Sequence, residues 1–137
     1  MGAVIDSFQA GMPVMVTHFL AAIGILLAGI VIYNAVTPFH ELRLIRAGNA
    51  AAGVSAAGAT IGLALPIAGA LAGSVNLYDL AVWGTVALVV QLLAFAIVAV
   101  AVRRLTDAIT RGDMASAILL AGVQISVGLI NAAAVRG

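Results

Sequence analysis

The sequence has no cysteine, no lysine and few charged side chains of either sign. Charged residues make up 8% of the 137 residues, against about 25% in an ordinary soluble domain. The lack of cysteine excludes disulfides, zinc–thiolate sites and cysteine nucleophiles. A net charge of +1 gives no basis for binding nucleic acid. With 64% hydrophobic residues, the chain is too apolar for intrinsic disorder. These features indicate a membrane protein, with the lipid bilayer as its main partner.

The charged residues divide the chain into four uncharged segments, each of 22 residues or more. A helix needs about 20 apolar residues to cross a bilayer, so each segment is long enough to cross once. Helices are required because every backbone polar group in lipid needs an internal partner. We therefore predict one all-α membrane domain over 1–137, with transmembrane helices near 13–36, 51–73, 80–102 and 114–135.

The arginines predict the orientation, because cytoplasmic loops collect basic residues. Only Arg136 lies outside the loops that follow the first and third predicted helices; the others are Arg43, Arg46, Arg103, Arg104 and Arg111. Both termini and the loop at 74–79 should then face the periplasm or the outside.

The two halves of the chain resemble each other at an offset of 64 residues. Between 41–73 and 105–137, ten of 33 positions are identical, although alanine and glycine richness inflates this count. Gly48 and Gly112 can each close a short helix, and the residue that follows each can cap the next helix. We predict two parallel repeats, about 13–73 and 80–137, related by an axis along the membrane normal.

The first cytoplasmic loop should contain a short helix lying on the inner leaflet, about 38–47. Thr37 is typical of an N-cap and Pro38 of a first helical residue. Glu41 lies early and Arg46 late, as the helix dipole favours. The alternatives are an ordinary positively charged connector or a loop that binds a partner.

Polar residues near mid-membrane are the candidate functional residues. Gln91 and Gln124 lie at the centres of the third and fourth helices, and Thr60 is the repeat equivalent of Gln124. Such residues should face other helices. They either hold the helices together by hydrogen bonds or line a pathway in an oligomer.

Small residues at four-residue spacing predict close helix packing, within the monomer or between subunits. They are Gly58 with Gly62, Gly69 with Gly73, and Gly122 with Ser126. Pro66 should kink the second helix, because it removes one backbone hydrogen bond.

The sequence predicts no catalytic residue, metal site or cofactor, and we expect no enzyme. His18 and His40 lie on opposite sides of the membrane in this topology, so they cannot share a metal. No charged residue lies within a predicted span, which argues against a proton-coupled pump.

Several features in this order resemble the YjfL-type bacterial inner-membrane family, whose domain is of unknown function. The matching positions are Thr37 to Glu41, Leu44, Ile45, Gly48 to Ala51, Gly58, Gly62, Pro66, Asp79, Trp83, Gln91 and Gly128 to Ala132. The resemblance implies a duplicated two-helix domain in the inner (plasma) membrane and a link to envelope maintenance. It implies no substrate and no catalytic residue.

Three functions remain open at this point. The first is a non-enzymatic homo-oligomer that maintains or organises the envelope. The second is an oligomeric channel or small-solute pathway, and the third is an accessory subunit bound to a membrane-protein partner.

Overall fold

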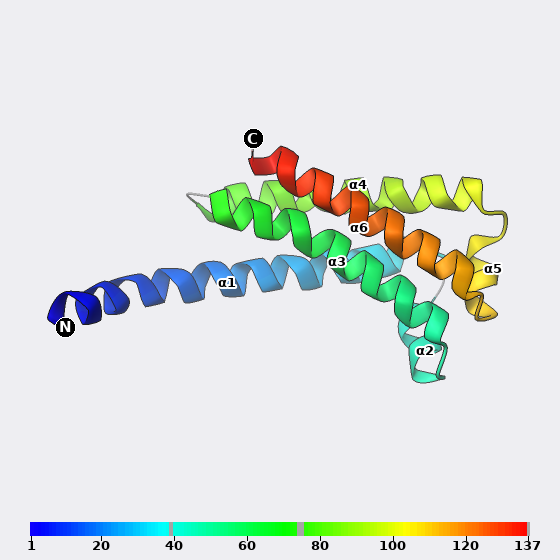
Figure 1. Ribbon diagram of the computed structural model, residues 1–137, viewed down its shortest axis with the longest axis horizontal. Coiled ribbons are helices and arrows are strands. Elements are labelled where there is room, and N and C mark those ends of the chain that lie inside the picture. Colours follow the sequence, from blue (N-terminus) through cyan, green and yellow to red (C-terminus); the bar gives the residue numbers. More distant parts are fainter. Residues whose placement is uncertain (39, 74–75, 137) are drawn as a thin grey trace.

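The computed structural model describes residues 1–38, 40–73 and 76–136, so Phe39, Ser74 and Val75 of the predicted loops lie outside the described residues. The regular structure of this part is entirely helical (Figure 1). Its elements are α1 (Gly2–Val36), α2 (Glu41–Arg46), α3 (Ala50–Gly73), α4 (Leu77–Ala101), α5 (Leu105–Thr110) and α6 (Met114–Arg136). The four long helices are long and apolar enough to cross a membrane. The all-α class and the four expected spans are thus confirmed for these residues.

The first helix is longer than the sequence predicts. It begins at Gly2 and not near residue 13, and its 35 residues continue through Pro13. At 1.5 Å per residue this helix is about 52 Å long, whereas a hydrocarbon core is about 30 Å thick. Its N-terminal part extends beyond the other helices in Figure 1. Proline usually begins or interrupts a helix, but α1 continues through Pro13, which explains the missed extension.

The junction between α1 and α2 corrects the predicted cap. Thr37 ends α1, because its backbone N–H and its hydroxyl both donate to the Tyr33 carbonyl, each at 2.9 Å. Pro38 follows, where a proline commonly comes after a finished helix. The short helix exists, but it covers Glu41–Arg46 and its N-cap is His40. Thr37 as its N-cap and Pro38 as its first residue were therefore wrong.

The two short helices end in the same backbone turn. Gly48 and Gly112 both have φ of +88°, a conformation that favours glycine. Each donates its N–H to the carbonyl three residues earlier, and the next residue, Asn49 or Asp113, donates to the carbonyl five residues earlier. This 6→1 and 4→1 pairing turns the chain sharply from α2 into α3 and from α5 into α6.

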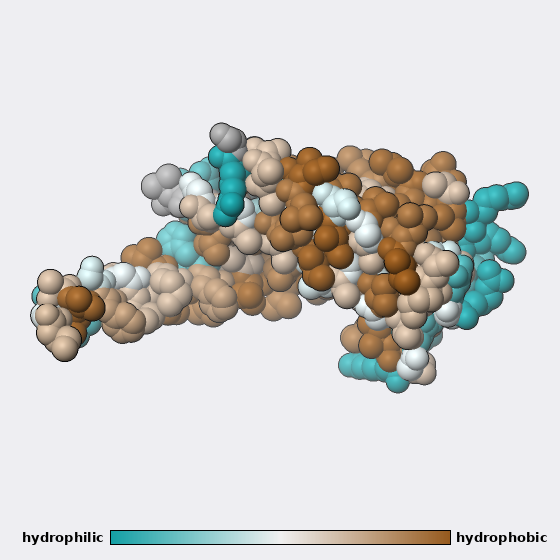
Figure 2. Space-filling view, in the orientation of Figure 1, coloured by the Kyte–Doolittle hydropathy of each residue, from teal (hydrophilic) through white to brown (hydrophobic). Residues whose placement is uncertain are grey.

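The long helices run in two directions. In Figure 1, α1 and α4 run toward the end where α2 and α5 lie, and α3 and α6 run back from it. The α3–α6 pair makes the most extensive contact and forms the centre of the bundle. Figure 2 shows that the sides of the bundle are mostly hydrophobic, with hydrophilic groups gathered near its ends. This distribution fits a helix bundle surrounded by lipid.

Two apolar clusters fill the bundle. The larger lies toward α2 and α5, where the rings of Tyr33 and Phe95 meet edge to face with centroids 6.1 Å apart. The smaller joins α1, α3 and α4 through Ala22, Ile67 and Leu80. Fully buried amide side chains accompany these apolar clusters, and they form the candidate site described next.

Candidate functional site

Gln91 of α4 is fully buried and bridges two other helices. Its Nε2 atom donates to the carbonyl oxygen of Gly62 on α3 at 3.0 Å and to that of Gln124 on α6 at 3.1 Å. An amide in the membrane needs such partners, and here both are backbone groups of neighbouring helices. The side chain therefore joins α3, α4 and α6 at one point.

Gln124 extends this connection to the first helix. It is fully buried, and its Nε2 donates to the hydroxyl of Tyr33, whose side chain is 1% exposed. Tyr33 lies 91 residues earlier in the chain, on α1. Together the two glutamines and this tyrosine connect all four long helices. We call these three residues the buried polar layer.

Glycine on α3 and α6 makes this approach possible. A Cβ on Gly62 would lie 2.7 Å from the Gln124 carbonyl oxygen and 2.8 Å from the Gln91 amide. A Cβ on Gly128 would lie 2.6 Å from the Gly62 carbonyl oxygen. Any larger residue at either position would push the two helices apart. The backbones therefore touch where the Gln91 amide binds them.

Two further glycines of α3 also contact α6. A Cβ on Gly58 would clash with the backbone of Ala121, and one on Gly69 would lie 3.0 Å from the Ala132 carbonyl oxygen. The face of α3 that carries Gly58, Gly62 and Gly69 is thus the face against α6.

The other three predicted packing residues face elsewhere. A Cβ on Gly73 or Gly122 would meet nothing within 4 Å. Ser126 is exposed, and its hydroxyl donates to the Gly122 carbonyl of its own helix at 2.7 Å. Packing of these three within the chain was therefore wrong. The spacing was read correctly, but it does not reveal which face of α6 turns inward.

Thr60 does not join the buried polar layer. It is half-buried, and its hydroxyl donates to the Ala56 carbonyl one turn earlier at 2.8 Å. The structure thus brings together two of the three predicted polar residues. Pro66 is buried in α3, which runs continuously through it. Its predicted kink stays a prediction.

The buried polar layer is not fully satisfied. Gln91 Oε1 and Gln124 Oε1 are buried and have no hydrogen-bond partner among the described residues. The Tyr33 hydroxyl can also donate once, and an acceptor within reach would use this proton. The two amides therefore hold spare acceptors inside the bundle.

A second buried polar contact joins α2 to α3, and the sequence did not predict it. The Ser55 hydroxyl donates to Glu41 Oε1 at 3.3 Å, and Glu41 is 4% exposed. Burial raises the pKa of Glu41 to about 7, although the hydrogen bond from Ser55 opposes this effect. A single acidic residue in a basic loop is expected to be solvated. The sequence alone therefore does not indicate that Glu41 is buried.

Asn49 connects the two halves at the same end of the bundle. Its Oδ1 caps α3 by accepting from the Ala52 N–H at 3.0 Å. Its Nδ2 donates to the carbonyls of Ile109 and Thr110 at the end of α5, both at 3.0 Å. The Asn49 side chain thus uses both its acceptor and its donors, and it joins two segments that are far apart in the sequence.

Asp113 holds the corresponding position before α6. Its carboxylate accepts from the Ser116 hydroxyl at 2.7 Å and from the Ala115 N–H at 3.1 Å. These bonds hold the pKa of Asp113 below its usual value, with a smaller contribution from Arg111. Both caps follow from the residue types that precede α3 and α6.

The five loop arginines are exposed. Arg43 and Arg46 lie in the last turn of α2. Arg103, Arg104 and Arg111 flank α5, and Arg104 Nε lies 3.4 Å from the Asp107 carboxylate. Such exposed pairs contribute about 0–1 kcal/mol, so this end of the molecule keeps an accessible positive charge.

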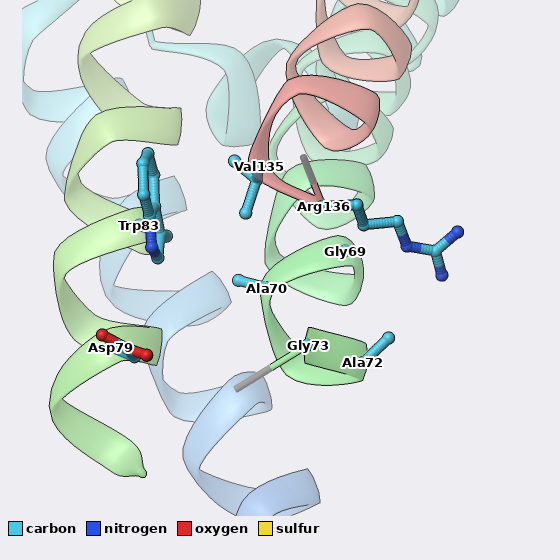
Figure 3. A pocket seen from close by; sticks show the side chains of 8 residues that line it. All are labelled: Gly69, Ala70, Ala72, Gly73, Asp79, Trp83, Val135 and Arg136. Carbon is cyan, nitrogen blue, oxygen red and sulfur yellow. The ribbon is translucent and has the colours of Figure 1, made fainter. Parts of the chain in front are cut away.

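A hollow of about 430 Å³ lies at the opposite end, between α3, α4 and α6. Asp79 and Trp83 line it from α4, and Arg136 from α6 (Figure 3). Figure 3 shows the Arg136 side chain directed away from Asp79. The polar groups do not converge, so this hollow offers no reactive arrangement. Within the described ranges no group of three metal-binding side chains lies together either.

Comparison with known proteins identifies the family. The model of a family described as "Domain of Unknown Function (DUF350)" matches residues 7–135. The chain belongs to the DUF350 family. The UPF0719 inner membrane protein YjfL of Escherichia coli strain K12 is 30% identical over 116 residues, which cover 85% of this chain and 88% of that protein. The protein of the same name from Escherichia coli O157:H7 matches equally well.

No solved structure matches this DUF350 chain. The relatives are inner-membrane proteins, and the four long helices have membrane-spanning length and composition. The chain is therefore an integral inner-membrane protein of a family whose function is unknown. The buried polar layer is the one arrangement in the described residues that links all four spans.

Proposed function

We propose that this DUF350 protein is a non-enzymatic, self-associating protein that maintains or organises the bacterial envelope. The observation that carries this proposal is that the buried polar layer serves to pack the helices together. The amide nitrogens of Gln91 and Gln124 bind backbone and side-chain groups of neighbouring helices and hold the spans together. Since the buried amide nitrogens are used for packing, we expect contact with other molecules at the outer surface.

The proposed topology has both termini outside the cytoplasm and α2 and α5 at the inner interface. It is supported by the gathering of Arg43, Arg46, Arg103, Arg104 and Arg111 at the end of the bundle where α2 and α5 lie. A reporter active only in the cytoplasm, fused to the C-terminus, should stay inactive. Activity there would overturn this orientation.

The proposed duplication is supported by the matching turns after α2 and α5 and by the parallel course of the two helix pairs. Each repeat then consists of a long helix, a short interfacial helix and a second long helix. The central pair, α3 and α6, occupies the same place in both repeats.

Self-association is supported by the outward face of α6. Gly122 and Ser126 are exposed there at small-residue spacing, which lets two helices approach closely in lipid. The long apolar surface of α1 adds to this, because few of its side chains are buried in the chain.

The test compares Gly122→Leu and Ser126→Leu with Ala96→Leu, a matched change on the exposed face of α4. Cross-linking in native membranes and mass measurement in lipid nanodiscs report the number of copies. The wild type and Ala96→Leu should form dimers or larger assemblies, and the α6 variants should form fewer. A wild type that stays monomeric in lipid would overturn self-association. A stoichiometric partner of another sequence would favour an accessory subunit.

The second candidate is an oligomeric solute pathway, favoured by the spare acceptors Gln91 Oε1 and Gln124 Oε1. Both amides are buried within one chain, so such a pathway requires the bundle to open. Gln91→Leu should abolish flux into liposomes in that case while the assembly stays intact. Absence of any flux with the wild type would reject this candidate.

A further inference from the structure

A crevice of about 310 Å³ lies between α1, α2 and α3, beside the buried Glu41. Most of its wall is apolar, with Ile30, Ile45, Ala56 and Leu63 from the three helices. The apolar wall runs along the flank of two membrane-spanning helices, where lipid chains lie. An acyl chain therefore suits this crevice by its chemistry and its place in the fold.

The crevice continues into a second, charged hollow. This hollow of about 500 Å³ shares Val31, Asn34, Glu41 and Leu42 with the crevice and adds His40, Arg43 and Arg46. Arg43 and Arg46 are three residues apart on α2, so they lie on neighbouring positions of the helix surface. Along the crevice, the apolar wall is thus followed by Asn34 and the buried Glu41, and then by two exposed guanidinium groups.

The amide between the two parts is Asn34. Its Oδ1 is buried and has no hydrogen-bond partner among the described residues. A buried acceptor without a partner is unfavourable, and a hydroxyl donor from a bound molecule would satisfy it. Asn34 lies on α1 one residue after Tyr33, at the level where the apolar wall meets the charged hollow.

The corresponding place in the second half is built differently. Leu105 stands at the repeat position of Glu41 and belongs to the apolar core. Arg104 there is beside Asp107, which partly neutralises it. Neither Arg103 nor Arg104 borders the crevice. Of the two basic clusters, Arg43 with Arg46 therefore borders this crevice, and Arg103 with Arg104 does not.

We propose that this crevice binds one anionic glycerophospholipid of the surrounding leaflet. Arg43 and Arg46 hold its phosphate, because guanidinium groups bind phosphate oxygens with paired hydrogen bonds. One acyl chain lies against Ile30, Ala56 and Leu63, and a headgroup hydroxyl donates to Asn34. Phosphatidylglycerol has all three features. The assignment holds whichever side of the membrane α2 faces, so it does not rest on the proposed function.

The test uses the full chain purified in an uncharged detergent. Phosphatidylglycerol, phosphatidylcholine with the same acyl chains, and inorganic phosphate are each titrated, with native mass spectrometry counting the bound lipids. We expect one saturable phosphatidylglycerol and at least tenfold weaker binding of phosphatidylcholine. Binding of free phosphate with equal affinity would overturn the lipid assignment, because the acyl chain would then contribute nothing.

Two double variants separate this crevice from general surface charge. R43Q/R46Q should weaken phosphatidylglycerol binding about thirtyfold, since a surface arginine contributes ~1 kcal/mol toward anionic lipid and 1.4 kcal/mol is tenfold. The matched R103Q/R104Q should change it less than threefold. Equal weakening by both pairs would overturn the proposal. Circular dichroism confirms that each variant is folded.

A third variant changes the apolar wall without changing charge. Ala56→Leu narrows the crevice and should weaken phosphatidylglycerol binding at least fivefold with both arginines in place. Unchanged binding would place the lipid outside the crevice and overturn the proposal. Cysteines introduced on α2 test whether a second copy covers this face. Complete cross-linking between two copies, unchanged by added lipid, would also overturn the proposal.

Discussion

Replacing Gly128 with alanine tests the close contact at the centre of the bundle. The added Cβ would lie 2.6 Å from the Gly62 carbonyl oxygen and 2.8 Å from the Gly62 Cα. Both are backbone atoms in the middle of α3, so they cannot rotate away as a side chain tip would. The two helices must separate by several tenths of an ångström at least.

The cost follows from three terms, two unfavourable and one favourable. Overpacking of a well-packed site costs about 1–3 kcal/mol. Alanine in place of glycine within a helix stabilises the helix by about 1 kcal/mol, because its helix propensity is higher. Separation also weakens the 3.0 Å bond from Gln91 to the Gly62 carbonyl, worth about 0.6 kcal/mol for an average bond between membrane helices. The net destabilisation relative to the wild type is then about 0.5–2.5 kcal/mol.

Gly53→Ala is the matched control, because Gly53 lies on the partner helix α3, outside the proposed subunit contact, and its Cβ would meet nothing within 4 Å. The propensity term is common to both variants, so their difference isolates the other two terms. Reversible unfolding by a denaturing detergent in mixed micelles, followed by circular dichroism, measures both stabilities. We expect Gly128→Ala to be about 1.5–3.5 kcal/mol less stable than Gly53→Ala, from the packing cost and the weakened bond together. Equal stabilities would refute the close α3–α6 contact.

Three further changes test the polar contacts. Gln91→Leu removes two interhelical bonds of about 0.6 kcal/mol each and should lower stability by about 1 kcal/mol in the same assay; no loss would show that the amide is not bound. The pKa of Glu41 is raised to about 7, above the value of 4.5 expected for the unfolded chain. Protonated Glu41 therefore stabilises the folded chain fully below pH 4.5, and this stabilisation is lost as pH rises through 7. Melting at pH 5 and 8 should show this loss in the wild type but not in Glu41→Gln, and equal pH dependence in both would contradict it. Asn49→Asp keeps the cap on α3 but removes the donors to α5, so it should destabilise the chain by about 1 kcal/mol, and Asn49→Ala by more, as measured by detergent unfolding.

The spans were predictable because lipid imposes a simple rule on the sequence. Eleven charges cannot enter the bilayer, so their positions mark the ends of the spans. The predicted helices at 51–73 and 114–135 agree with α3 and α6 to within a residue at each end. The start of α1 was missed because a proline is typical of a helix start, whereas α1 continues back through Pro13, past Asp6, to Gly2.

The inward faces of the helices were much less predictable. In water an apolar stripe marks the buried face, but these helices are apolar on every side. Gly58 and Gly122 each follow an alanine and occupy equivalent positions of the proposed repeats, yet Gly58 contacts α6 and Gly122 is exposed. Thr60 and Gln124 also differ, because Gln124 is fully buried and Thr60 is half-buried. The partner of Gln124, Tyr33, is 91 residues away, and no local pattern indicates such a pair.

The Thr37–Pro38 error has a related origin. Threonine followed by proline is typical of a helix start, but a threonine can equally bond back to its own helix and a proline can follow a helix end. Residue types alone do not distinguish the two cases. The deciding fact is the pair of bonds from Thr37 to the Tyr33 carbonyl.

The polar contacts have one property that the proposed duplication explains. The Gln91–Gly62, Gln124–Tyr33 and Asn49–Ile109 bonds each join one half of the chain to the other. Two of the side chains in these bonds have apolar equivalents at the repeat position: Leu27 for Gln91 and Ile97 for Tyr33.

A symmetric pair of repeats can dock in more than one register, because small apolar residues dominate both faces. Polar groups present in only one half remove this freedom, since each finds its partner in one arrangement alone. A single buried polar residue can fix register between helices in this way. Glu41 is likewise polar in only one half. It accepts a hydrogen bond from Ser55 beside the crevice, whereas Leu105 at the equivalent position belongs to the apolar core. Under the proposed duplication, divergence of the two halves thus fixes the register of the bundle and leaves the crevice beside Arg43 and Arg46 alone.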